Sequence, residues 1–411
     1  MTCRSRTNNI LLLIIDGLDK TKGCWPQWTF RTSKDLSTFN RPRICVHLAI
    51  AHGYCCDFYL TDDEDFFHGA STLCEMVTRT LARVKAICTC QGLPFPEHFI
   101  LQSDNTPAQA KNQEMIVFLA ALVRKYKFKT TSLMFLRVGH THIDVDFLPG
   151  TEILLLASEK HITFPTQASI YVVPRFSILL ALVLRRFRFK VPEELRLAIL
   201  AGMAQTIGAR GEMLHCELLS HTRNFQVWLR AMGAHPYNCL KPHGDKDCPH
   251  SFVFKMRMDL TAKENSWLAR EPTDAGWSSK DPSDVFCIVK SFMSSTEANG
   301  PPVLVIPSER FQRLTQAPSG TCYATKPMSD DRRNQLRALA NKLQVLTGSW
   351  SPEHSYFEAA KQLRELADGR DKYVSQDGFL EGMEAPRHVP VEEHALPSAY
   401  VPCSASWQEL H

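Results

Sequence analysis

The stretch ILLLIIDGLDKTK, residues 10–22, contains a short apolar run that ends at Asp16-Gly17, with a second acid at Asp19. An apolar run of this length followed by a turn signal predicts a strand that is buried on both faces. A carboxylate at the tip of such a strand is costly unless a charged partner lies against it. We therefore expect strand 10–15 to be central in its sheet and to deliver Asp16 to a functional site.

The same pattern recurs twice. In FILQSDN, residues 99–105, Asp104 follows an apolar run, and in SLMFLRVGHTHIDVD, residues 132–146, Asp144 and Asp146 follow another. Three carboxylates can hold two divalent ions about 3.5–4 Å apart, which activate a water or hydroxyl and stabilise the leaving oxygen of a phosphodiester. Mg²⁺ prefers such hard oxygen ligands. The pattern predicts a site for Mg²⁺ or Mn²⁺ built from Asp16, Asp104 and either Asp144 or Asp146.

Each acid also has a plainer interpretation. Asp-Gly and Asp-Asn are common turn formers, so Asp16 and Asp104 could simply end their strands. Asp144 and Asp146 could be the N-cap and first-turn acids of a helix. His140 and His142 could orient phosphate, bind a metal or cap a loop.

Composition limits the class of protein but does not decide its function. The chain has 411 residues, of which 44% are hydrophobic, and a formal net charge of +4. This mildly basic balance permits a nucleic-acid partner without requiring one. The 14 cysteines form no C-x-x-C pair, which favours reduced thiols in a nuclear or cytoplasmic protein. The apolar runs 10–15 and 178–184 are too short for a signal peptide or a membrane span, so we expect neither.

Periodicity and turn signals predict alternating elements in the first half of the chain. Strands are expected at 10–15, 43–51, 54–60, 99–102 and 132–138, and helices at 73–90 and 105–126. This order predicts an α/β fold with a mixed five-stranded sheet and flanking helices. It resembles the order of a ribonuclease H-like sheet, in which the first and fourth strands are neighbours. Asp16 and Asp104 would then lie side by side.

The second half of the chain predicts a smaller α+β region. Helices are expected at 178–203, 224–232, 329–346 and 351–367, and strands at 251–260 and 284–292. Proline should keep the apolar segment 301–307 at a sheet edge or outside the sheet. We divide the chain into a core at 9–205, an α+β extension at 206–328, a helical pair at 329–368 and a polar, Pro-rich tail at 369–411 that we expect to be disordered.

Several separate motifs resemble a large uncharacterised eukaryotic family of transposon-derived proteins. They are LIIDGLDKTK, RPRICVHLAIAHGY, LQSDNTPAQAKNQ, FLRVGHTHIDVDF, CPHSFVFKMRMDL and DVFCIVKSFMSST, and they occur in order over residues 9–307. That family itself looks like a divergent ribonuclease H-like transposase or integrase core of the DDE/DDD kind. The resemblance implies DNA as partner and metal-dependent phosphodiester cleavage or strand transfer.

The resemblance also assigns residues by position. Asp16 and Asp104 match the first two acids of the family, and Asp146 or Asp144 matches the third. A further set of positions would support the site or contact nucleic acid, either by the resemblance or through their positive charge. They are Asp19, Lys22, Asn105, Lys111, Asn112, His140, His142, Arg185, Arg186 and Arg188. The chain departs from the family at Ile143, where glutamate is usual. It departs again at residues 148–176, which interrupt the expected helix after the third acid.

Other readings remain open. The first is an inactive, domesticated remnant that binds nucleic acid or protein through the same surface. The second is a calcineurin-like metallophosphoesterase, suggested by Gly139-His140-Thr141-His142, although the other motifs of that class are absent from the sequence. Cys239, His243, Cys248 and His250 lie in one short loop, but their spacing fits no established zinc pattern. The basic run 185–190 is either a solvated helix face or a DNA contact.

Overall fold

The fold is that of a computed structural model. It describes residues 9–17, 23–28, 36, 39–64, 69–103, 110–135, 189–208, 213–219, 222–234, 236–241, 249–268, 281–292, 295, 297–314, 328–347 and 356–368.

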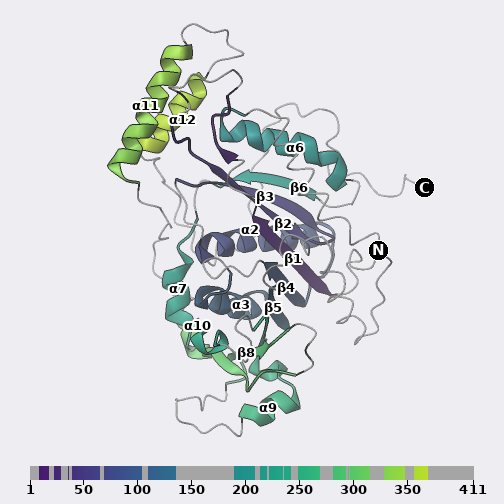
Figure 1. The fold of residues 1–411 in the computed structure, drawn as a ribbon. Coiled ribbons are helices and arrows are strands. Elements are labelled where there is room, and N and C mark those ends of the chain that lie inside the picture. The colour runs from purple at the N-terminus through teal and green to yellow at the C-terminus, as the bar shows by residue number, and fades with distance from the viewer. Residues whose placement is uncertain are drawn as a thin grey trace, which may run out of the picture.

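A single twisted sheet runs through the described residues in the strand order β6-β3-β2-β1-β4-β5-β7-β8-β9. Figure 1 shows the succession from β6 through β3, β2, β1 and β4 to β5, with β8 beyond. Its strands are β1 (Ile10–Gly17), β2 (Ile44–Ala51), β3 (Cys55–Asp62), β4 (His98–Ser103), β5 (Thr130–Phe135), β6 (Met213–Leu218), β7 (Ser251–Met256), β8 (Val285–Lys290) and β9 (Val303–Ile306). The pairs β1–β4, β4–β5 and β3–β6 are parallel, and the other neighbours are antiparallel. The architecture is therefore mixed α/β, and the expected adjacency of the first and fourth strands is confirmed.

The expectation of five strands was wrong, because nine are present in the described residues. β6 extends the sheet beyond β3, and β7, β8 and β9 extend it beyond β5. Every residue of β3 is buried, and β3 has a neighbour on each side, β2 and β6. The segment 303–306 is the last strand on the other side, so its two flanking prolines lie beside a sheet edge, as expected.

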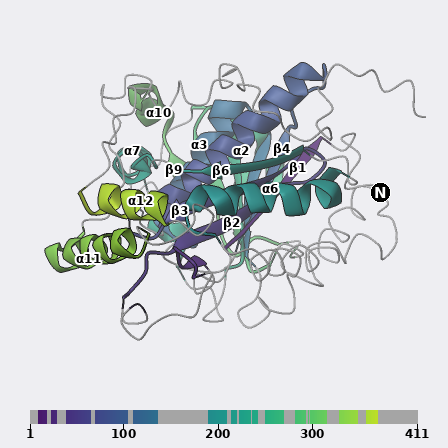
Figure 2. The same ribbon diagram turned by 90° about the horizontal axis from the view of Figure 1, so that it is seen from above.

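Helices cover both faces of the sheet. One face packs against α2 (Ala70–Cys90), α3 (Gln113–Tyr126) and α7 (Phe225–Met232). The other packs against α6 (Pro192–Gly208) and a helical pair, α11 (Asp330–Thr347) and α12 (Phe357–Asp368), which lie side by side in Figure 2. Strand β1 contributes alternate residues to the two faces and is buried from Leu11 to Ile15, as the apolar run predicted.

Several helix boundaries differ from the sequence-based expectation. Helix α3 begins at Gln113 instead of residue 105, because Asn112 has extended backbone and caps it. Ser71 lies inside α2 instead of capping it, and its hydroxyl accepts a hydrogen bond from the Phe225 amide at 3.1 Å. Helix α12 begins at Phe357 instead of 351, and α6 begins at Pro192. The expected helix turns at 178–188 and the segment 148–176 lie outside the described residues.

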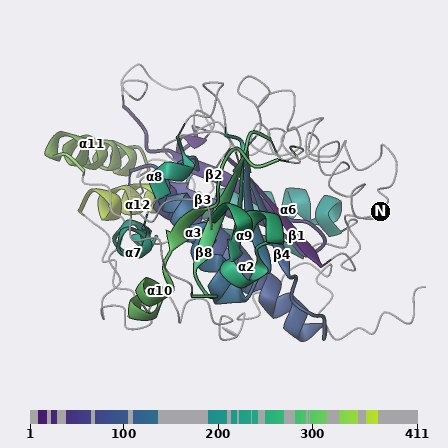
Figure 3. The same ribbon diagram turned by 90° about the horizontal axis from the view of Figure 1, so that it is seen from below.

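Some elements carried no recognisable sequence signal. These are β6, α8 (Pro236–Cys239), α9 (Ala262–Leu268), α10 (Ser308–Leu314) and the 3₁₀ turn Arg257–Asp259. Figure 3 shows α9 next to β8, and Leu268 packs against the buried cluster that contains Phe286 and Ile288. In the part of the chain that the structure describes, no helix is both long and apolar enough to cross a bilayer.

Candidate functional site

The first candidate residue, Asp16, lies at the carboxyl end of β1 in the middle of the sheet. β1 pairs with β4 in parallel, and the register joins Ile14 to Gln102. Asp16 is two residues beyond that pair and is exposed, whereas the five residues before it are buried. Its Oδ1 accepts a hydrogen bond from the Gly17 amide at 2.8 Å. The carboxylate is therefore presented at the surface by a strand that cannot shift without disturbing the core.

We call this region the Asp16 end of the sheet. It is the end at which β1, β3, β4, β5, β6 and β8 finish and at which β2, β7 and β9 begin. Directly paired residues of neighbouring strands project to the same face. One row of such pairs runs from β1 to β8 and consists of Ile14, Gln102, Met134, Ser251 and Lys290. Asp16 lies on the same face as this row, opposite the face covered by α2 and α3.

Lys111 approaches the same end of the sheet from the other face. Its ammonium lies 5.9 Å from the ring centroid of Phe135, the last residue of β5. Phe135 is paired with Ser103, the last residue of β4. The structure thus brings a cation close to the ends of the two strands that follow β1 in the sheet.

Asn112, by contrast, has a structural role. Its side-chain oxygen accepts a hydrogen bond from the Met115 amide at 3.0 Å and caps α3. Its side chain is thereby turned toward the helix backbone. We assign Asn112 to positioning α3 and the neighbouring Lys111, and not to direct contact with a ligand.

The remaining predicted site residues lie outside the described residues. They are Asp19, Lys22, Asp104, Asn105, His140, His142, Asp144, Asp146, Arg185, Arg186 and Arg188. Within the described ranges, no three His, Cys, Asp or Glu side chains are grouped so that they could hold a metal ion. The described residues thus include one acid of the proposed metal site, Asp16, and the strand end that immediately precedes Asp104.

Two members of the considered zinc loop are described, and both have other roles. Cys239 is fully buried in the core on α8. His250 stacks on Phe292 with ring centroids 5.1 Å apart and an interplanar angle of 11°. His243 and Cys248 lie outside the described residues.

Sequence reasoning missed His47, which is paired with Gly17 across β1 and β2. A methyl group placed on Gly17 would lie 3.4 Å from the His47 Cδ2 atom, so the imidazole covers the backbone next to Asp16. The sequence around it, ICVHLAIA, has the pattern of an ordinary buried strand. Only the strand pairing shows that this histidine adjoins the candidate site.

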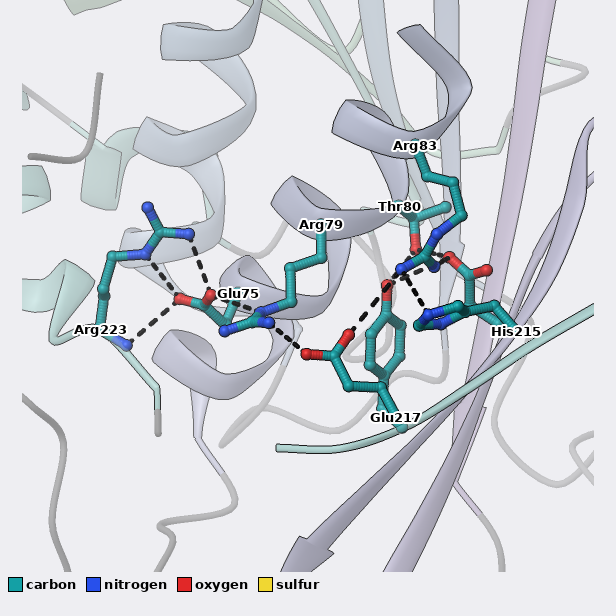
Figure 4. A network of polar contacts seen from close by, with 9 residues as sticks. Glu75, Arg79, Thr80, Arg83, His215, Glu217 and Arg223 are labelled. Carbon is teal, nitrogen blue, oxygen red and sulfur yellow. Dashed lines mark hydrogen bonds and ion pairs between the residues drawn. The ribbon is translucent and has the colours of Figure 1, made fainter. Parts of the chain in front are cut away.

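A second polar cluster lies between α2, β3 and β6, and Figure 4 shows it. The Glu75 carboxylate is fully buried and accepts hydrogen bonds from Arg223 Nε at 2.8 Å and Arg79 Nε at 2.8 Å. Arg79 also pairs with Glu217 on β6. Burial alone would raise the pKa of Glu75, but the hydrogen bonds and charges of Arg223 and Arg79 outweigh it and lower that pKa to about 2.

The same cluster continues along β3. Asp57 is fully buried, and its Oδ2 accepts hydrogen bonds from Tyr59 at 3.1 Å and Thr80 at 2.9 Å and an ion pair from Arg83 at 2.6 Å. Arg83 also lies 3.3 Å from His215 Nε2. Burial and the Arg83 charge lower the pKa of His215 to about 4, so the imidazole is neutral at pH 7. Because each buried carboxylate has a guanidinium partner, the cluster serves to join β6 and the segment before α7 to the core.

Comparison with known proteins adds a family match but no activity. A family model described as a domain of unknown function (DUF7869) matches residues 34–161. The matched range includes β2, β3, β4, β5 and the helices between them, whereas β1 and Asp16 precede it. No match was found among curated proteins or among solved structures. This chain is therefore similar, over these residues, to a domain family whose description names no function.

Proposed function

We propose that the Asp16 end of the sheet carries out divalent-metal-dependent phosphodiester cleavage or strand transfer on DNA, on a ribonuclease H-like core of the transposase kind. The observation that carries the proposal is the parallel pairing of β1 with β4, with Asp16 exposed where β1 ends. If the register of Ile14 with Gln102 continued for two residues, Asp16 would be opposite Asp104. Two acids at that spacing can share a divalent ion.

Strand order supports the same proposal. The strands from the first third of the chain are arranged β3-β2-β1-β4-β5, with the first two pairings antiparallel and the last two parallel. The sequence led us to expect one part of this arrangement for a ribonuclease H-like core, the pairing of the first strand with the fourth. A similar fold does not by itself imply the same activity, so the proposal depends on Asp16 and the other acids of the predicted metal site.

The residues have separate roles in this proposal. Asp16 and Asp104, with Asp146 or Asp144, would hold Mg²⁺ or Mn²⁺, and the exposed carboxylate of Asp16 suits a hard cation. The bound ions would supply a nucleophilic water or hydroxyl and stabilise the leaving oxygen. Lys111 would hold a non-bridging phosphate oxygen near the end of β5, because its ammonium already lies there. Asn112 would fix Lys111 through the cap of α3.

The experiment compares purified full-length protein with Asp16→Asn and Asp104→Asn. Asp259→Asn is a matched control, because Asp259 is exposed and follows β7 at the opposite end of the sheet. We expect Mn²⁺ binding by calorimetry and Mg²⁺-dependent nicking of plasmid DNA in the parent and the control only. Nicking that persists in chelator or in both variants would exclude the proposal. A folded parent that neither binds Mn²⁺ nor nicks DNA would point to an inactive remnant.

A further inference from the structure

Among the described strands, β6 is the last one on its side of the sheet, and it pairs with β3 alone. Most of its residues are half-buried. On the face toward α2, the middle of β6 carries two polar side chains, His215 and Glu217. His215 lies directly opposite Asp57 of β3. On this face β6 is therefore joined to α2 by polar contacts, and such an outer strand opens at a lower cost than a central apolar one.

Arg83 of α2 is the centre of these contacts (Figure 4). Its Nη1 atom lies 2.6 Å from Asp57 Oδ2, and its Nη2 atom lies 3.3 Å from His215 Nε2 and 3.8 Å from Glu217 Oε2. A guanidinium group can only donate hydrogen bonds, so the Nε2 atom of His215 must be the acceptor. The neutral imidazole therefore carries its proton on Nδ1, and its contact with Arg83 exists only while Nε2 is unprotonated.

Protonation of His215 would turn this contact into a repulsion. An N–H group on Nε2 would point at a donor, and the positive imidazolium would lie next to a guanidinium. Asp57 favours the charge, but its Oδ2 atom is already occupied by other donors. The charged groups around the imidazole are Arg79 and Arg83 from α2, Arg196 from α6, Asp57 from β3 and Glu217 from β6. Burial and the arginine charges outweigh Asp57 and lower the pKa of His215 to about 4.

We propose that His215, Arg83 and Asp57 form an acid-sensitive latch, which holds β6 on β3 at neutral pH and releases this strand first when the pH falls. His215 takes up a proton when β6 separates, whereas the central strands keep their apolar packing. The contact is complete above the unfolded pKa of about 6.5 and is lost as the pH falls through the folded pKa of about 4. The open fraction of β6 should therefore rise about 70-fold between pH 7.5 and pH 4.5. Neither Asp16 nor a bound metal takes part, so the latch is independent of the proposed catalysis.

The test is amide hydrogen exchange of the full-length protein at pH 7.5, 6.0 and 4.5, measured by mass spectrometry and corrected for the intrinsic effect of pH. Peptides that cover residues 213–218 report on β6, and peptides that cover residues 10–15 and 98–103 report on the central strands. His215→Gln keeps an acceptor for Arg83 but cannot take up a proton. His98→Gln is the matched control, because His98 lies on β4 and pairs with Thr130 of β5 at 2.8 Å. Circular dichroism at pH 7.5 establishes that each variant is folded.

We expect the protection of β6 amides to fall about 70-fold from pH 7.5 to pH 4.5 in the parent and in His98→Gln, and to show no such fall in His215→Gln. The central strands should exchange more slowly than β6 at each pH. Protection of β6 that does not change with pH would overturn the inference, and so would exchange of β6 together with the central strands at every pH. A folded His215→Gln that keeps the decline would also overturn it. The comparison of peptides within the parent decides the question even if His215→Gln fails to fold.

Discussion

Replacing Glu75 by glutamine should cost this protein about 3 kcal/mol of folding free energy. The carboxylate is fully buried between Arg223 and Arg79, and its pKa is lowered to about 2. A shift of roughly 2.3 units from the ordinary value of about 4.3, at about 1.36 kcal/mol per unit, gives about 3 kcal/mol. Removing one partner of a buried ion pair typically costs about 3–5 kcal/mol, because the remaining charge is left uncompensated. Two independent routes therefore agree on the magnitude.

The assay is urea unfolding at pH 7 followed by circular dichroism. Glu365→Gln is the matched control, because Glu365 is exposed on α12 and should change stability by less than about 0.5 kcal/mol. Combining Glu75→Gln with Arg223→Met should cost less than the sum of the single changes, since both partners are then absent. A loss below about 1 kcal/mol for Glu75→Gln, or strict additivity with Arg223→Met, would refute the reasoning.

Two further predictions concern a titration and a helix cap. The pKa of His215 falls from about 6.5 in the unfolded chain to about 4 in the fold. The stability that this contributes, up to about 3 kcal/mol, should be complete above pH 6.5 and disappear as the pH falls to 4. Urea midpoints measured from pH 7.5 to 4.5 should decline in this way for the parent. The midpoints of His215→Gln should not show this decline. Asn112→Ala should destabilise α3 by about 1 kcal/mol through loss of its cap, whereas Asn112→Asp should preserve stability in the same unfolding assay, and equal losses would contradict the capping role.

The central strands could be predicted because each is a strong local signal. The runs that became β1, β2, β4 and β5 are apolar, short and bounded by turns, and their boundaries shifted by only a few residues. β6 could not be predicted in this way. Polar and apolar residues alternate irregularly in its sequence, MLHCEL, and most of its residues are only half-buried. It forms a strand because β3 offers it a free edge and because Glu217 pairs with Arg79.

The site was predicted from the acids that follow apolar runs. Asp16 lies at the end of a central buried strand, as that pattern implied, and its part in a metal site stays a prediction. What sequence reasoning could not supply were contacts between distant positions. Arg223 binds Glu75 from 148 residues away, and Lys290 reaches the row of Ile14 only through three intervening strands. Neither residue differs in its local sequence from an ordinary surface cation, so only strand pairing and side-chain packing identify them.

The origin of the outer strands has a consequence for synthesis of the chain. The five central strands are complete once residue 135 has left the ribosome, but β6 and β7 follow only at residues 213–218 and 251–256. At the usual rate of about 5–20 residues per second, the apolar borders of β3 and β5 stay unpaired for several seconds or longer. The unpaired backbone N–H and C=O groups of an edge strand are a template for pairing with other chains. The nascent protein should therefore depend on chaperones during this interval, and shortened chains that stop before β7 should aggregate.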